Sequence, residues 1–307
     1  MRKILAIALL FLSSPAGAAD FKPNVLDPTY NHDRWGTSAN CILANFRAYT
    51  SCFDDFDDDN DDGISDVWGV PEWVAYEIKK TDAQCIKTYA RPSKWITDPD
   101  LFTHGIMPDD KSYAYPKAFT SKRKDGFSRG HLAMKMHAER LGADAGWNTH
   151  TFYNAVPQRQ RFNAGIWLDL EDLTSAWAQE YGSIWIITGP IFADKSPYAS
   201  IGQEGEFPVA IPDALFKIVV KESVDPERPD VLAFIYPQVG AGYYEGKPFD
   251  HTRYMTSIDE IEKLTGIDFF QSLPDAAKET IKSQEKHPLW PVKNQDFIKA
   301  CQSGYND

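Results

Sequence analysis

The sequence predicts an α+β fold in a single domain. Candidate strands and helices both occur, but they do not follow the regular βαβ order of a parallel sheet. The chain has 307 residues, of which 43% are hydrophobic and 13% aromatic, so it can bury a large core. It contains no repeat of solenoid period and no Gly/Ser-rich or Pro-rich linker that would divide it.

Short alternating or apolar runs predict the strands. In chain order they are 73–78, 127–133, 152–157, 183–187, 207–220 and 231–236. The run at 183–187 is expected to stop at Gly189-Pro190, a turn-forming pair. Residues 20–53 and 91–127 have no such periodicity, and we expect irregular structure there.

Two segments predict helices. Apolar residues in 163–180 form one broad stripe at helical spacing, made of Ile166, Trp167, Leu170, Leu173, Ala176 and Trp177. The second helix spans 257–265, because Ser257 and Glu260 have capping-box spacing and Gly266 is suited to end a helix.

Residues 1–19 have the pattern of a secretory signal peptide. Arg2 and Lys3 precede an apolar run at 4–12, and small residues then lead to Ala16-Gly17-Ala18, an A-x-A-type cleavage site. The run is too short to span a bilayer, and no later stretch is long and apolar enough. We therefore expect a secreted or periplasmic protein that has no membrane segment after cleavage. A buried N-terminal helix is the alternative.

Four cysteines remain after cleavage, and they are Cys41, Cys52, Cys85 and Cys301. An even number in an exported protein predicts two disulfides. Three pairings are open, of which proximity along the chain favours Cys41–Cys52 and leaves Cys85–Cys301. Zinc is the competing interpretation, but no C-x-x-C spacing supports it.

The charge is negative overall but locally positive. The net charge is −12, or −14 without Arg2 and Lys3, and this repels phosphate backbones at long range. Residues 117–161, however, hold nine Lys or Arg against three acids, a local charge of +6. A basic island in an acidic chain favours an anionic ligand there, and a solvated basic face is the alternative.

The first motif with chemical content is Ser128-Arg129-Gly130-His131. A histidine can take a proton from water near neutral pH. Arg129 would point to the same face of a strand as His131 and can grip a phosphate with two hydrogen bonds. Gly130 leaves room for a close approach. By itself the tetrapeptide also fits a surface arginine beside a packed histidine.

The second motif is Asn154-x-x-Pro157-Gln158, followed by Asn163, Trp167 and Glu171. On a regular helix, Asn163 and Glu171 are two turns apart and about 80° around the axis, on the same general side. An amide oxygen can bind Mg²⁺, and a nearby carboxylate can hold the waters on that ion. The alternative is a capping asparagine and a solvated glutamate.

Together the two motifs resemble the DNA/RNA non-specific endonuclease family, the ββα-metal or His-Me finger nucleases. That family carries D-R-G-H, then N-x-x-P-Q, then an Asn nine residues after the first, with Trp and Glu following. The internal spacings are all kept here. Thr188-Gly189-Pro190, Pro212-x-x-x-Phe216-Lys217 and the segment 258–266 look like further signatures, so the resemblance covers about residues 73–270.

The resemblance implies a ββα-metal nuclease core, with a mixed or antiparallel sheet and flanking helices, in a single domain over 20–307. It also implies hydrolysis of DNA and RNA to 5′-phosphorylated oligonucleotides. His131 would deprotonate the attacking water, and Asn163 would hold one divalent ion, Mg²⁺ or another such as Mn²⁺. Glu171 would hold the waters of that ion.

Three further residues take roles from the resemblance. Arg129 would bind the phosphate, and Arg91 lies where the family carries a phosphate-stabilising arginine. Asn154 would orient His131 or its neighbours. Ser128 departs from the family, whose first motif residue is usually Asp, and a serine supplies no negative charge beside Arg129 or His131.

Residues 54–66 hold eight aspartates and follow the D-x-[DN]-x-[DN]-G pattern of calcium loops. The candidate ligands are Asp58, Asn60, Asp62, Ile64 and Asp66. Gly69 stands where an EF-hand has its twelfth-position Glu, so we expect a shorter loop with a structural Ca²⁺. A disordered acidic loop is the alternative.

Three functions compete. The first is an exported nuclease with DNA and RNA as substrates. The second is an exported calcium-binding interaction protein with a degenerate nuclease fold, favoured by the acidic loop and Ser128. The third is a metal-dependent phosphodiesterase that acts on small nucleotides. Nothing in the sequence specifies an oligomeric state.

Overall fold

The computed structural model describes residues 26–55, 67–113, 126–193, 197, 199–240, 243, 246–284, 288–293 and 298–301. The predicted signal peptide over 1–19 and the five candidate calcium ligands lie outside these residues. Within them, no helix is long and apolar enough to cross a membrane.

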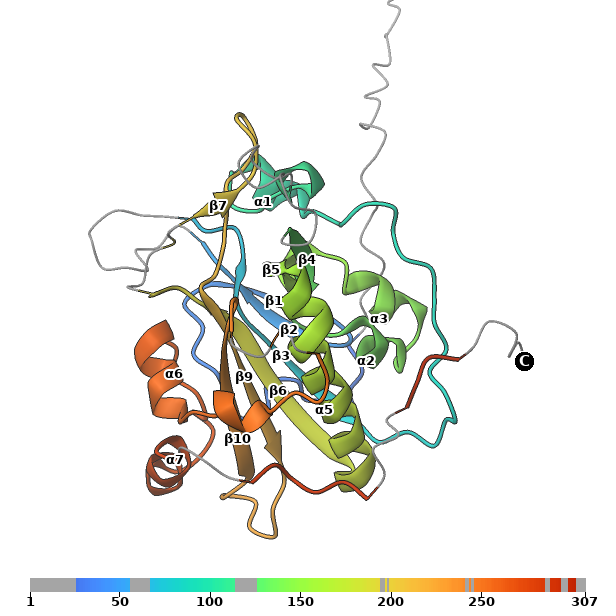
Figure 1. Cartoon of the computed structure of the whole chain (residues 1–307), viewed down its shortest axis with the longest axis vertical. Coiled ribbons are helices and arrows are strands. Elements are labelled where there is room, and N and C mark those ends of the chain that lie inside the picture. Colours follow the sequence, from blue (N-terminus) through green and yellow to red (C-terminus); the bar gives the residue numbers. More distant parts are fainter. Residues whose placement is uncertain are drawn as a thin grey trace, which may run out of the picture.

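A six-stranded antiparallel sheet forms the centre of the molecule, with strand order β1-β2-β3-β6-β9-β10 (Figure 1). The strands are β1 (Ile42–Asn45), β2 (Thr50–Phe53), β3 (Pro71–Lys79), β6 (Ser183–Ile191), β9 (Ala214–Lys221) and β10 (Asp230–Pro237). The predicted strands at 73–78 and 231–236 are confirmed. The hairpin β1–β2 lies in a segment that we expected to be irregular.

Helices cover both faces of this sheet, which explains why its central strands are almost entirely buried. On one face lies the long helix α5 (Leu168–Tyr181), and on the other lie α6 (Ile258–Thr265) and α7 (Asp275–Lys282) (Figure 1). The alternation along β3 serves both faces, since Val74 and Tyr76 pack toward α5 and Trp73 and Ala75 toward α6. Two cores therefore share one sheet.

A second, two-stranded ladder lies beside the amino-terminal end of α5 (Figure 1). It pairs β4 (Phe127–His131) with β5 (Ala155–Arg159), and the chain runs from β5 into the helical segments without a loop. This is the predicted ββα arrangement. The remaining elements are α1 (Pro99–Thr103), η1 (Asp110–Tyr113), α2 (Lys135–Glu139), α3 (Ala143–Asn148), η3 (Phe152–Asn154), α4 (Gln160–Phe162), η4 (Asn163–Trp167), β7 (Ser200–Ile201), β8 (Val209–Ala210) and η6 (His251–Tyr254).

Several predicted boundaries were wrong. Strand β6 continues through Gly189-Pro190 to Ile191. Position 189 requires glycine because a Cβ there would lie 2.1 Å from the carbonyl oxygen of Glu72. Glycine here permits close strand packing instead of a turn. The run at 207–220 is broken into β8 and β9, and residues 152–157 begin as the 3₁₀ turn η3 before β5. The predicted helix over 257–265 is confirmed with its cap, since Ser257 Oγ accepts a hydrogen bond from the Glu260 amide at 3.2 Å.

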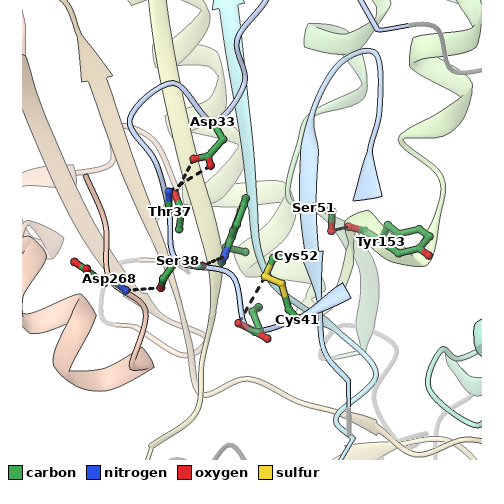
Figure 2. Close-up of a disulfide and its surroundings, with 10 residues drawn as sticks. Asp33, Thr37, Ser38, Cys41, Ser51, Cys52, Tyr153 and Asp268 are labelled. Carbon is green, nitrogen blue, oxygen red and sulfur yellow. Dashed lines mark hydrogen bonds between the residues drawn. A yellow bond between two sulfur atoms is a disulfide. The ribbon is translucent and has the colours of Figure 1, made fainter. Parts of the chain in front are cut away.

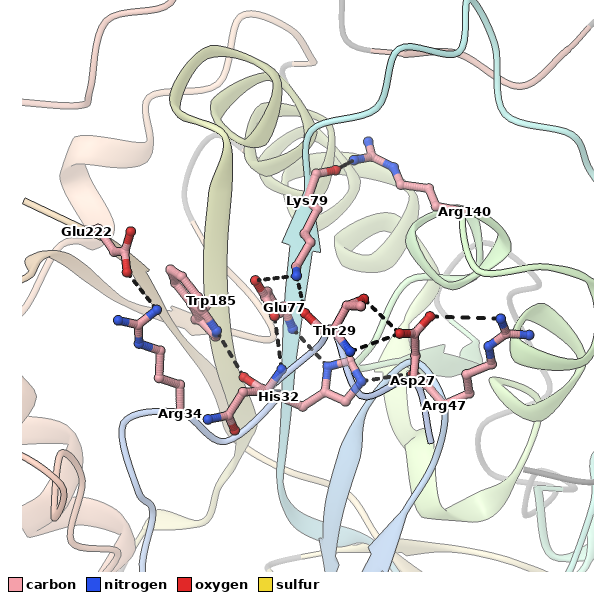
Figure 3. A network of polar contacts seen from close by, with 11 residues as sticks. Asp27, Thr29, His32, Arg34, Arg47, Glu77, Lys79, Arg140, Trp185 and Glu222 are labelled. Carbon is pink, nitrogen blue, oxygen red and sulfur yellow. Dashed lines mark hydrogen bonds and ion pairs between the residues drawn. The ribbon is translucent and has the colours of Figure 1, made fainter. Parts of the chain in front are cut away.

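A polar network holds the segment after residue 26 across the end of β3 (Figure 3). His32 accepts from the Glu77 amide at Nδ1, at 3.1 Å, and donates from Nε2 to the Arg47 carbonyl at 2.9 Å. The Asn31 amide donates to the Glu77 carboxylate at 3.0 Å, and Trp185 Nε1 donates to the Asn31 carbonyl at 3.0 Å. This segment is thereby tied to two central strands.

Both disulfides are present in the favoured pairing, Cys41–Cys52 and Cys85–Cys301. Cys41–Cys52 joins the residue before the edge strand β1 to the neighbouring strand β2 (Figure 2). Cys85–Cys301 joins positions 216 residues apart. A backbone bridge between Ile86 and Ala300 reinforces that junction.

Candidate active site

Strand β4 carries Arg129 and His131 on one face and Gly130 between them. Gly130 faces its partner strand, where a Cβ would lie 2.0 Å from Oε1 of Gln158. The close approach that this glycine permits is therefore made by the Gln158 side chain. Strands β4 and β5 therefore pack tightly beside Arg129 and His131.

His131 lies half-buried at the end of β4. Trp95 packs against its ring with a centroid distance of 4.8 Å, and the ring of His150 meets it edge-on at 4.9 Å and 90°. Burial, followed by the charges of His150, Arg91 and Lys135, holds the pKa of His131 well below its usual value of 6.5. The ring is therefore neutral at neutral pH, as a general base must be.

The guanidinium of Arg129 is held by η1. Its Nη2 donates to the Asp110 carbonyl at 2.9 Å, and its Nε lies 3.0 Å from Asp110 Oδ1 as an ion pair that is not aligned as a hydrogen bond. Its Cζ also lies 5.4 Å from the ring centroid of Tyr113. Asp110 thus supplies the negative charge that Ser128 does not.

Asn154 braces the backbone on both sides of the site and is fully buried. Its Oδ1 accepts from the Ala133 amide at 2.7 Å, and its Nδ2 donates to the Ala133 and Thr149 carbonyls, each at 2.9 Å. Ala133 is two residues after His131, and Thr149 immediately precedes His150. Asn154 therefore fixes the positions of both histidines through the main chain.

Asn163 lies at the start of η4, a π-helical segment, and not in the regular helix that the apolar stripe predicted. Gly165 has non-helical angles, φ −110° and ψ −113°, so the chain kinks between α4 and α5. The predicted placement of Asn163 and Glu171 two turns apart on one regular helix is therefore wrong, because the kink lies between them. The kink leaves the Asn163 side chain half-buried and without a hydrogen bond among the described residues.

Glu171 is buried, which excludes the solvated glutamate considered from the sequence. Its Oε1 lies 3.9 Å from Nζ of Lys217, a fully buried lysine on β9 that also sits 4.0 Å over the Trp167 ring. Burial raises the pKa of Glu171 to about 7, and burial lowers that of Lys217 to about 8, while each charge opposes the shift of the other. The pair is buried but not fully hydrogen-bonded.

These donors fit a hydrated divalent cation. Asn163 offers a free amide oxygen at the kink, and the Glu171 Oε1 atom is buried without a hydrogen bond among the described residues. Elsewhere in the described part of the chain, the group of candidate metal ligands that lie close together is Cys41, Cys52 and Glu72. Both of those cysteines are in a disulfide, so that group is not a metal site.

Arg91 is exposed and close enough for its charge to affect His131 and His150. The segment before it is held by a buried ion pair on α2, between Lys135 and Glu139. Lys135 Nζ donates to the Tyr89 carbonyl at 3.0 Å, and Glu139 Oε1 accepts from the Tyr89 amide at 2.7 Å. This pair, which we name the Tyr89 clasp, anchors the chain two residues before Arg91.

Sequence reasoning missed several residues of this site. Neither His150 nor Asp110 was singled out from the sequence, and Lys217 was noted only within a signature. None of them has a spacing relation to His131 or Asn163, because each reaches the site through tertiary folding. The basic island is also less uniform than expected, since Lys135 lies in a buried ion pair and Arg129 is paired with Asp110.

Comparison with known proteins identifies the family of this chain. The model of the family described as DNA/RNA non-specific endonuclease matches residues 61–276. The mouse protein named "Nuclease EXOG, mitochondrial" is 27% identical over 215 residues, covering 66% of this chain and 53% of that protein. The chain thus spans about half the length of this relative. The Serratia marcescens protein named "Nuclease" is 28% identical over 216 residues, covering 69% of this chain and 73% of that protein.

Among solved structures, the fold is similar to a chain in the crystal structure of the EndoG/EndoGI complex. The TM-score is 0.57 at 19% sequence identity, with 79% of this chain and 91% of that chain covered. This likeness confirms the predicted α+β, ββα-containing architecture.

Proposed function

Because this chain belongs to the DNA/RNA non-specific endonuclease family, we propose that it hydrolyses phosphodiester bonds in DNA and RNA with His131 as general base. The proposal rests mainly on where three residues lie. Arg129 and His131 lie on one face of β4, and its partner strand β5 leads directly into the kinked helical segment that carries Asn163. The neutral state of His131 supports it.

In the proposed reaction, His131 takes a proton from a water molecule while the water oxygen forms a bond to phosphorus. The bond from phosphorus to the 3′ oxygen breaks, and that oxygen leaves with the electron pair and is protonated from solvent. The products are a 5′-phosphate and a 3′-hydroxyl. Arg129 and Arg91 would bind the phosphate oxygens as negative charge builds on them.

We propose that Asn163 binds one divalent cation, Mg²⁺ or Mn²⁺, with Glu171 orienting the waters of that ion. Bound there, the cation would offset charge on the phosphate and on the leaving oxygen. Lys217 would keep Glu171 ionised and fixed in place, because removing the lysine charge would favour the protonated carboxyl.

We further propose that the chain is exported as a single nuclease domain over 20–307 after loss of residues 1–19. The two disulfides support an oxidising compartment. Cell fractionation with amino-terminal sequencing tests this, and recovery of the protein with residues 1–19 intact in the cytoplasm would contradict it. The calcium loop stays a prediction. If it binds a structural Ca²⁺, adding Ca²⁺ should raise the melting temperature of the protein.

The test of the main proposal is digestion of plasmid DNA and of RNA by oxidised protein, with Mg²⁺ or with chelator. We expect cleavage of both polymers only with metal, and a loss of at least about a hundredfold in His131→Ala. Asn163→Ala should lose a comparable amount, and Arg228→Ala, in an exposed turn, should retain full activity.

The alternatives predict other outcomes. If wild type and His131→Ala are equally inert with every metal, the nuclease proposal fails and a calcium-binding interaction protein is favoured. If small phosphodiesters are cleaved and polymers are not, the enzyme is a nucleotide phosphodiesterase.

A further inference from the structure

His150 is a second imidazole that lies against the ring of the proposed base. It follows α3, is 2% exposed, and meets the His131 ring edge-on at 4.9 Å. Trp95 packs against both rings, at 4.8 Å from His131 and 5.5 Å from His150. Trp95 therefore contacts both imidazoles and covers part of each ring.

The hydrogen-bonding state of His150 follows from its neighbours. Its Nδ1 lies 3.3 Å from the Gly146 carbonyl oxygen and 3.4 Å from Thr149 Oγ1. The Thr149 hydroxyl donates its own hydrogen to the Gly146 carbonyl at 2.8 Å, so both neighbours of Nδ1 can only accept and Nδ1 carries the hydrogen. Burial, followed by the charge of Arg91, lowers the pKa of His150 to about 4, so the ring is neutral at neutral pH. Its Nε2 then has a lone pair, yet it is buried and makes no hydrogen bond among the described residues.

His131 presents the complementary atom. Its Nε2 is also buried and makes no hydrogen bond within the described part of the chain. Leaving two buried polar atoms without a hydrogen bond is unfavourable. One water molecule between the rings, accepting from Nε2–H of His131 and donating to the lone pair of His150 Nε2, satisfies both atoms at once.

We propose that His150 is a positioning residue whose Nε2 accepts a hydrogen bond from one water molecule that in turn accepts from Nε2–H of His131, so that Nδ1 of His131 keeps the lone pair that accepts the proton. The inference rests on the proposed function for its catalytic meaning. The tautomer itself is a property of the folded protein and is measurable without substrate. Asn154 contributes by fixing the backbone next to both rings.

The variants separate hydrogen bonding from packing. His150→Phe keeps a flat ring against Trp95 and His131 but has no acceptor. His150→Gln places an amide oxygen near the position of the lost Nε2. A merely structural role would be served better by Phe than by Gln, whereas the proposed role requires the reverse.

The first experiment is ¹⁵N NMR of the imidazole nitrogens in the full mature protein at neutral pH, with His131 assigned from a His131→Asn variant. We expect the Nε2–H tautomer in wild type and in His150→Gln, and a mixture of tautomers in His150→Phe. A wild-type spectrum with the hydrogen of His131 on Nδ1 would overturn the proposal, whatever the variants do.

Kinetics on DNA form the second experiment. We expect kcat to fall about tenfold in His150→Phe with little change in KM, a part of the roughly hundredfold or greater contribution of a general base. His150→Gln should recover most of it. Equal kcat in wild type and a folded His150→Phe variant would also overturn the proposal. A wild type that is inert on nucleic acid but shows the Nε2–H tautomer would instead contradict the proposed function alone.

Discussion

The carboxylate of Asp110 lies 3.0 Å from Nε of Arg129, and the Asp110 carbonyl accepts from Nη2 of the same guanidinium. These residues are 19 positions apart, and the second contact uses backbone that η1 fixes in place. Asp110 Oδ1 also accepts from the Trp95 amide at 3.1 Å, and Trp95 packs on His131. One carboxylate thus orients the phosphate-binding candidate and the aromatic ring beside the base.

This contact predicts that Asp110→Asn impairs substrate binding. The half-exposed Arg129 would lose its charged anchor, and we expect KM to rise about fivefold to tenfold, equivalent to roughly 1–1.4 kcal/mol. Steady-state kinetics on DNA measure it, with Asp225→Asn, in an exposed turn, as the matched control. Adding Ser128→Asp should restore part of the loss, and no change in KM for Asp110→Asn would contradict the assignment.

The pKa of His131 predicts the acid limb of the pH profile. Because burial and nearby charge hold this pKa well below 6.5, the ring stays unprotonated to lower pH than an ordinary histidine. We expect log kcat/KM to fall with a slope of about one below pH 7 as Glu171 is protonated, and to steepen only below pH 6.5 as His131 is protonated. Arg91→Gln removes a positive charge near His131, so the steepening should move to higher pH. A wild-type profile that steepens at or above pH 6.5 would contradict this.

The Tyr89 clasp predicts a remote effect on phosphate binding. Glu139→Met removes the acceptor for the Tyr89 amide and leaves Lys135 unpaired, so Arg91 loses its anchored position. We expect a loss of about threefold to tenfold in kcat/KM that is not additive with Arg91→Ala in a double-mutant cycle. Glu180→Met on α5, whose partner Lys293 is exposed, is the control. Full additivity would show that the clasp acts on stability alone.

The two disulfides should contribute unequally to stability. Cys85–Cys301 closes a loop of 216 residues and Cys41–Cys52 one of 11. By chain entropy, replacing the first pair with alanine should lower the free energy of unfolding by roughly 2–3 kcal/mol more than replacing the second. Urea unfolding of the two double variants under oxidising conditions measures this. Equal losses would mean that native-state packing at Cys52, and not loop closure, dominates.

The sequence by itself determined the local features of this protein. Period-two and period-3.6 apolar patterns located β3, β4, β10 and α6, because these patterns reflect which side of an element is buried. The spacing from Arg129 to Glu171 identified the family, since the ladder and the following helix are contiguous in the chain. Proximity along the chain also favoured the correct disulfide pairing.

Only the tertiary structure decided which distant residues serve the site. Asp110, His150 and Lys217 reach Arg129, His131 and Glu171 from other elements, and no local period records such contacts. The kink at Gly165 was hidden for the same reason, because the apolar stripe continues across it while the backbone does not. Local pattern encodes burial, whereas the charges and hydrogen bonds around a reacting group depend on how the elements pack in three dimensions.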